Sequence, residues 1–305
     1  MRMDDSALRE TRDALRKSMM RRLETDIRIP PLLVVAMAVL ITVAMIAAVA
    51  VVVIEVFDSY DRYGGSDDIP SAYDIYNRPE IIVLWLTTLL GWGVLAKVSY
   101  DLVSRQTKHF DREKELRTAM SSLVDPYHDK WDGHNILPEK TERRRIPLFW
   151  FFVVIGSSIT SLVFTLAVSY SVDSLTRLLL MILMIVLSIA CYILELYMLC
   201  FLTKEMSDHH RRWYDFTLDV KRRLARSGYI AGHLHTPNPL PSRDNAVYVV
   251  VTIFFSPFIY YWWYATVKDG NLHFEEQARF ENGLLKMLES NPRPQSSPPA
   301  VTAQV

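Results

Sequence analysis

The stretch HFDREKELRTAM at residues 109–120 returns in altered form as HFEEQARFENGL at residues 273–284. Each copy begins with a histidine and a phenylalanine and places a large apolar residue seven positions after the histidine. A third histidine, His209, joins the same register. Because offsets of seven and eleven residues fall on one face of an α-helix, the sequence predicts three amphipathic helices of one kind. The apolar positions are Leu116, Phe216 and Phe280, then Met120, Val220 and Leu284.

The repeated positions form a signature that we interpret as structural: His109, Phe110, His209, His273 and Phe274. The ninth residue before each histidine lies near the end of an apolar run, so each amphipathic helix is expected to follow a membrane helix. The first two histidines are 100 residues apart, which predicts an internal repeat of one amphipathic helix and two spans. The alternative is that amphipathic helices of similar composition resemble one another without any repeat.

Long apolar runs separate the charged segments of this 305-residue chain. A helix rising 1.5 Å per residue needs about 20 residues to cross about 30 Å of hydrocarbon. Most of the runs reach that length, and the shortest recruits Lys97 to Tyr100 as an interfacial end. The sequence therefore predicts an all-α polytopic membrane protein with four spans and a fifth segment, either a span or a re-entrant hairpin. The runs are 31–57, 81–96, 146–170, 178–202 and 246–267.

The runs divide the chain into successive predicted parts. These are an amphipathic N-terminal helix (1–28), a first transmembrane hairpin (29–103), a cytoplasmic helix and loop (104–145), a second transmembrane hairpin (146–203), a second cytoplasmic helix and loop (204–245), the fifth membrane segment (246–267), a C-terminal helix (268–291) and a disordered tail (292–305). The tail is rich in proline and serine, which is typical of disorder.

Lysine and arginine alternate from loop to loop. Residues 1–30 hold eight of them, residues 97–145 eleven, and the segment between the fourth and fifth runs eight, whereas the other two loops hold two and one. Positively charged loops stay in the cytoplasm. The sequence thus predicts a multi-pass protein of the cell membrane with a cytoplasmic N-terminus.

The fifth run contains a proline in the segment TIFFSPFIYYWWYATVKDGNLHF, residues 252–274. Proline lacks an amide donor and disturbs the preceding helical turn, so Pro257 is a candidate bend. Either the run crosses the membrane once and exports its helix, or it bends at Ser256-Pro257 and returns that helix to the cytoplasm. Charge in the tail does not decide between the two.

The same segment, continued as EEQARFEN to residue 282, resembles the aromatic helix end of uncharacterised prokaryotic multi-pass membrane-protein families, which are domains of unknown function. In these families a Gly/Pro-Tyr-Trp stretch runs into a charged helix. The resemblance implies membrane location and defines no catalytic residues. This chain carries Pro257 where glycine is usual.

Two ionisable residues near the cytoplasmic ends of predicted spans are functional candidates, because burying charge in a membrane is costly. Glu195 lies about two turns inside the fourth run, and Lys97 lies near the same end of the second. If the repeat makes these spans equivalent, the two side chains form an intramembrane ion pair or line a pathway. The alternative is that both reach the headgroups.

Small hydroxyl side chains recur at every fourth position of the third run. Such a row favours close packing between helices over a polar pathway. These helix-packing residues are Ser157, Ser161, Thr165 and Ser169.

Histidines outside the spans raise the question of a metal site. His233 and His235, with His209 and His210, are candidate ligands, since neutral imidazole binds transition metals. The loops contain no cysteine, and no HExxH helix is present. From the sequence we therefore expect no metal and no cofactor.

Enzymatic signatures are missing: the chain has no glycine-rich phosphate loop, no GxSxG motif and no paired carboxylates within a span. We expect no catalytic residues and no enzyme. Balanced charge argues against nucleic acid, and basic clusters beside the spans fit anionic lipid headgroups of the bilayer. The leading interpretation is an integral membrane protein that binds a protein partner or a second copy of itself through its cytoplasmic amphipathic helices. The alternative is a small-solute or ion transporter or channel built from degenerate repeats.

Overall fold

The computed structural model describes residues 5–63, 79–124, 145–170, 174–226 and 228–290, and every regular element within these ranges is a helix. The helices are α1 (Asp5–Thr25), α2 (Pro31–Tyr63), α4 (Pro79–Val124), α5 (Pro147–Tyr170), α6 (Ser174–Arg226), the 3-10 turn η2 (Ala231–His233), α7 (Asn245–Phe254) and α8 (Phe258–Ser290).

Local sequence explains where several of these helices begin. Pro31, Pro79 and Pro147 each open a helix, at a position where the missing amide hydrogen has no intrahelical partner. At α7 the carboxylate of Asp244 caps the helix by accepting hydrogen bonds from the first turn, including one of 2.8 Å from the amide of Ala246.

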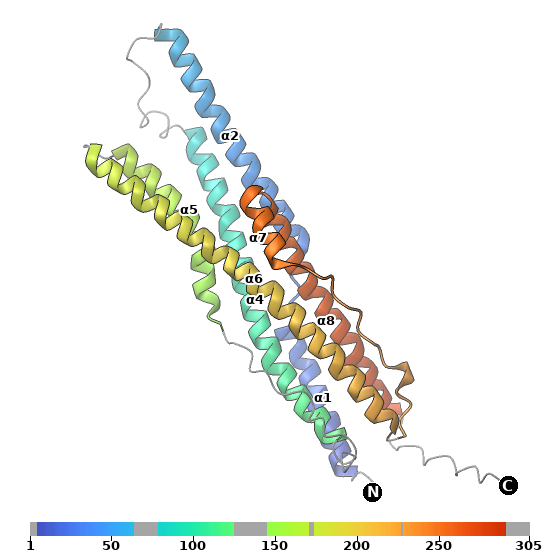
Figure 1. Cartoon of the computed structure of the whole chain (residues 1–305). Helices are drawn as coiled ribbons and strands as arrows, with labels where there is room; N and C mark the ends of the chain where they lie inside the picture. The colour runs from blue at the N-terminus through green and yellow to red at the C-terminus, as the bar shows by residue number, and fades with distance from the viewer. Residues whose placement is uncertain (1–4, 64–78, 125–144, 171–173, 227, 291–305) are drawn as a thin grey trace, which may run out of the picture.

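The helices form a long bundle (Figure 1), and its two halves differ in the side chains that they expose. In the apolar half, large hydrophobic side chains of α2 and of the first part of α6 face outward. Three helices are long and apolar enough to cross a membrane: Pro31–Ile54, Pro79–Met120 and Leu178–Arg226. The helices α4 and α6 have 46 and 53 residues and therefore extend for about 70 and 80 Å, far beyond one bilayer. Their C-terminal parts belong to the polar half.

Of the four predicted spans, the third corresponds to α5. This helix is apolar, and its segment Pro147–Thr160 is a shorter apolar helix that falls below spanning length. The helix α7 has only ten residues. Within the described ranges, three helices therefore have spanning length. Four spans remain a prediction.

The fifth predicted segment is a helical hairpin. The helix α7 ends at Phe254 and α8 begins at Phe258, so the chain reverses around Pro257. The ring of Tyr248 lies 5.4 Å from that of Trp262, and Arg243 pairs with Asp269, which places the start of α7 beside the second to third turn of α8. This reversal sends α8 into the polar half, beside α4 and α6 (Figure 1).

The polar half is a four-helix arrangement of α1 with the C-terminal parts of α4, α6 and α8. Its hydrophobic core joins one apolar side chain from each helix, and all four are at most 2% exposed: Leu15, Leu116, Phe216 and Phe280. Met120, Val220 and Leu284 lie in the same cluster. The apolar faces recognised in the sequence therefore pack against one another.

Candidate metal centre

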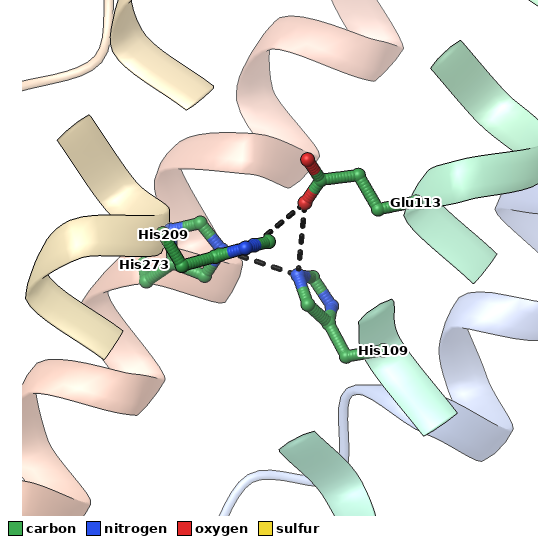
Figure 2. Close-up of side chains that lie close together, drawn as sticks. All are labelled: His109, Glu113, His209 and His273. Carbon is green, nitrogen blue, oxygen red and sulfur yellow. Dashed lines mark hydrogen bonds and ion pairs between the residues drawn. The ribbon is translucent and has the colours of Figure 1, made fainter. Parts of the chain in front are cut away.

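Between the apolar half and this core, three histidines and a glutamate from three helices converge (Figure 2). His109 and Glu113 come from successive turns of α4, His209 from α6 and His273 from α8. One donor atom from each residue lies within 4.8 Å of every other, and all four residues are buried. We call this group the His3Glu cluster.

The spacing of the donor atoms suits a small cation. The Nε2 atoms of His109 and His273 are 3.1 Å apart. Oε2 of Glu113 lies 2.6 Å from Nε2 of His209 and 3.6 Å from Nε2 of His109. Four ligands at about 2.0–2.1 Å from a tetrahedral Zn²⁺ lie about 3.3 Å from one another, so the cluster needs only small adjustments to close around an ion.

The outer nitrogen of His109 is held by Asp26, which follows α1. Nδ1 of His109 lies 2.8 Å from Oδ1 of Asp26. Burial alone would raise the pKa of the Asp26 carboxyl, but attraction to His109 and Arg112 outweighs burial and lowers it. An ionised carboxylate can only accept, so Nδ1 of His109 carries the hydrogen and its Nε2 turns a lone pair into the cluster whenever the ring is neutral.

A second chain of hydrogen bonds orients His273. Nε2 of His210 lies 2.7 Å from the carbonyl oxygen of Asn238, which can only accept, and Nδ1 of His210 lies 3.0 Å from Nδ1 of His273. With Nε2–H donating to the carbonyl, a neutral His210 accepts at Nδ1 from His273. Burial, reinforced by the neighbouring histidines, lowers the pKa of His273 well below its usual value, so this ring is neutral.

These two assignments leave an electrostatic conflict that a cation resolves. When both rings are neutral, the Nε2 lone pairs of His109 and His273 face each other across 3.1 Å, with the carboxylate of Glu113 beside them. Lone pairs repel unless a proton or a metal ion lies between them. Three imidazoles in their neutral form, one carboxylate and a second carboxylate behind one of the imidazoles are a donor set that could hold a divalent transition metal.

The phenylalanines of the signature enclose the cluster. The ring of Phe110 lies 4.4 Å from that of His209, and the ring of Phe274 lies 4.6 Å from that of His109. In both cases a phenylalanine covers a histidine of another helix. The repeated His-Phe pair thus supplies a ligand and an apolar shield.

Buried charges on the core side of the cluster are paired. Arg112 is fully buried and donates to both oxygens of Glu281, at 2.9 and 3.1 Å, and to Asp26 at 2.8 Å. The second oxygen of Glu113 accepts a 2.5 Å hydrogen bond from Arg117. Burial raises the pKa of Glu281, although Arg112 opposes that effect. This network fixes α1 and α8 to α4 around the ligands.

Two irregular segments are fastened to the same region. In the linker between α1 and α2, the carbonyl oxygen of Ile29 accepts a 2.7 Å hydrogen bond from Asn271. The carbonyl oxygen of Ile27 accepts a 3.2 Å hydrogen bond from Arg105. The loop before α7 is held by Glu276, which lies 2.5 Å from Nε2 of His235 and accepts from the amide of Asn238 at 3.0 Å. The linker thereby positions Asp26, which contacts His109. The loop positions the carbonyl of Asn238, which contacts His210.

The candidates expected from the sequence are placed as follows. Lys97 is exposed and pairs with Asp101 one turn away, whereas Glu195 is buried and accepts a 3.0 Å hydrogen bond from Trp263. The structure does not bring Lys97 and Glu195 together, because one faces outward from α4 and the other faces α8. Pro257 lies at the turn between α7 and α8.

The remaining candidates fall into two groups. His233 is exposed and His235 binds Glu276, so neither joins His209. The packing residues of the third run lie in α5, but their side chains are outside the described part of the structure: Ser157, Ser161, Thr165 and Ser169.

Sequence reasoning recognised the three histidines as a repeat and missed that they meet. Glu113 and Asp26 were not identified at all, and His210 was considered only as a ligand together with His209, His233 and His235. For Glu113 the signal was present, because a glutamate four residues after a histidine lies on the same helical face. Asp26 and His210 have no such signal, since their roles depend on contacts with other helices.

Compared with known proteins, the chain matches no family model, no curated protein and no solved structure. The function must therefore be argued from the site itself, and the resemblance to uncharacterised prokaryotic membrane-protein families stays a prediction.

Proposed function

We propose that this chain is a multi-pass protein of the cell membrane whose polar half binds one divalent transition-metal ion through His109, Glu113, His209 and His273. The observation that carries this proposal is the pair of Nε2 atoms 3.1 Å apart, in two rings whose outer Nδ1 atoms are hydrogen-bonded to Asp26 and to His210. The ion ties together three helices that lie far apart in the chain.

The donor set favours zinc among the common metals. Three imidazoles and one carboxylate suit Zn²⁺, Co²⁺ or Ni²⁺, and the absence of a thiolate disfavours Cu⁺. Glu113, as a ligand, and Asp26, behind His109, supply two negative charges that offset those of the ion. Four protein ligands complete a tetrahedral shell, and such closed sites are structural rather than catalytic. A non-enzymatic role follows from this shell.

The membrane orientation is part of the proposal. The basic residues that flank the apolar runs put the N-terminus in the cytoplasm, where anionic headgroups attract them. The polar half, with its metal site, then forms a helical layer beneath the bilayer. A protein partner or a second copy of the chain is expected to bind this layer, with the ion keeping its helices in register.

Metal analysis of the purified protein tests the proposal. The wild-type protein is expected to hold close to one zinc ion per chain after dialysis, and His273→Asn and Glu113→Gln are expected to lose it. His233→Asn is the matched control, because His233 is exposed and outside the cluster. A protein that holds no ion after incubation with Zn²⁺, Co²⁺ or Ni²⁺ would show that a proton bridges the histidines instead, and the proposal would fail.

Transport of a small ion is the second candidate function. The observation that favours it is Glu195, a carboxyl group buried to 3% exposure in the apolar half. Flux of common ions into liposomes that contain the purified protein, lost on Glu195→Gln, is the expected result for a transporter. If liposomes with the protein take up no more of these ions than empty liposomes do, a transport function for these ions is excluded.

A further inference from the structure

Glu195 is a buried titratable group that the metal site does not use. It lies on α6, about 22 Å along the helix from His210, at the rate of 1.5 Å per residue. Its carboxyl accepts one hydrogen bond, 3.0 Å from the indole nitrogen of Trp263 on α8. Apolar side chains surround it, since Leu196, Leu199 and Trp263 belong to one hydrophobic cluster.

No positive charge compensates this carboxyl within the described ranges. The helices α5 and α7 contain no charged residue. On α4 the basic residue expected from the sequence, Lys97, is exposed and paired with Asp101. The titratable groups that interact electrostatically with the carboxyl are themselves neutral in ordinary conditions: Cys191 and Tyr192 on α6, and Tyr260 on α8. An ionised carboxylate would therefore be both desolvated and unpaired, which proteins avoid.

The interface between α6 and α8 holds the group in place. Two consecutive tryptophans of α8 donate across it, Trp262 to Thr203 at 2.9 Å and Trp263 to Glu195. Thr203 also lies 3.3 Å from the hydroxyl of Thr266. An amide would accept the hydrogen bond from Trp263 equally well, so the property that glutamate adds at this position is a proton that can be bound and released.

We propose that Glu195 is a proton-binding site in the apolar half, and that it carries its proton at neutral pH while α8 is packed against α6. The ligand is a proton, and the acceptor is one carboxylate oxygen enclosed by Trp263 and the surrounding apolar side chains. Release of the proton creates a charge that requires water, so it requires α8 and its hairpin partner α7 to move away from α6. This proposal does not depend on the metal site.

Infrared spectroscopy of the purified full-length protein tests it directly, since a protonated carboxylic acid has a carbonyl stretching band that a carboxylate lacks. At neutral pH the wild-type protein is expected to show this band, and Glu195→Gln is expected to lose it. Glu281→Gln is the matched control, because Glu281 is equally buried but paired with Arg112. The band assigned to Glu195 should survive that substitution and should also survive removal of metal by a chelator.

A spectrum in which Glu195→Gln removes no carbonyl band overturns the proposal. Should the glutamine variant fail to fold, Glu195→Asp keeps a carboxyl group at the same place and is expected to show the band at a shifted frequency. The acid band at neutral pH could be absent from both the wild-type protein and a folded Glu195→Asp variant. That result would show that the carboxyl group at position 195 is ionised and hydrated.

Discussion

Asp26 and His210 do not belong to the His3Glu cluster, yet each determines which nitrogen of a ligand is free to bind. Asp26 accepts from Nδ1 of His109, and His210 accepts from Nδ1 of His273. Residues that orient histidine ligands in this way change metal affinity without contacting the ion.

We therefore expect Asp26→Asn and His210→Phe each to weaken zinc binding by about 10- to 100-fold while leaving the stoichiometry at one. The loss arises because the ligand tautomers and ring orientations are no longer specified. Competition with a chromophoric chelator measures the affinity. His233→Phe is the control for the second variant, and equal affinities for the control and His210→Phe would contradict the assignment of His210.

The titration of His273 predicts how acid affects the metal-free protein. Its pKa is lowered in the folded state, mainly by burial, so below the usual value of about 6.5 the unfolded chain binds a proton that the folded chain does not. Stability is therefore lost as pH falls below about 6.5, by on the order of 1 kcal/mol per pH unit. Asp26 and Glu276, whose pKa values are lowered, lose their stabilising effect only near or below pH about 4.

Thermal unfolding in the presence of a chelator is measured at about pH 7.5 and about pH 5.5. These values lie on either side of the usual histidine pKa and above the range in which Asp26 and Glu276 titrate. The difference in Tm is expected to shrink in His273→Gln, which keeps a polar side chain but cannot titrate. An unchanged difference would mean that another group causes the acid sensitivity.

At the scale of elements, α4, α6 and α8 each contribute an apolar stretch, a residue of the His3Glu cluster and a core face in that order. In α4 these are the run from Ile81, then His109, then Leu116, and α8 repeats the last two as His273 and Phe280. The histidine and the core residue are seven positions apart in each case, so the His3Glu cluster and the hydrophobic core lie about 10 Å apart along these three helices. Binding of the ion and packing of the core are therefore expected to support each other.

Substitution of the core faces tests this arrangement. Leu116→Asp and Phe280→Asp place a charge at fully buried positions and are expected to cost more than about 4 kcal/mol, enough to unfold the polar half. Leu23→Asp is the control, because Leu23 on α1 is 86% exposed. Circular dichroism and limited proteolysis report the outcome. If Leu116→Asp and Leu23→Asp behave alike, the buried core described for the polar half is wrong.

For the whole molecule, the hairpin of α7 and α8 decides which parts of the chain lie side by side. Because the chain reverses around Pro257, α8 runs beside α1 and the C-terminal parts of α4 and α6 (Figure 1). A fifth crossing would have separated His273 from His109, which lies 3.1 Å from it. The proposed metal site therefore requires the fifth segment to be a re-entrant hairpin, and a fifth span would exclude it.

Thiol labelling in cells tests this topology. In a background with serine at Cys191 and Cys200, cysteines placed at Lys17 and Ser290 are both exposed and lie on α1 and α8. A membrane-impermeant reagent is expected to label both only after the cells are opened. Labelling of the Ser290 position in intact cells would make the fifth segment a span and would exclude the shared bundle.

By itself the sequence determined the helical class, the apolar runs, the repeated His-Phe pair and the apolar faces that follow it, because these are periodic properties of single helices. It also offered Pro257 as a bend while leaving its consequence open. Only the tertiary structure decided that His109, His209 and His273 meet beside Glu113, that Asp26 and His210 orient them, and that Lys97 and Glu195 stay apart. Those contacts depend on the depth and rotation of separate helices relative to one another, and no pattern within one helix encodes either quantity.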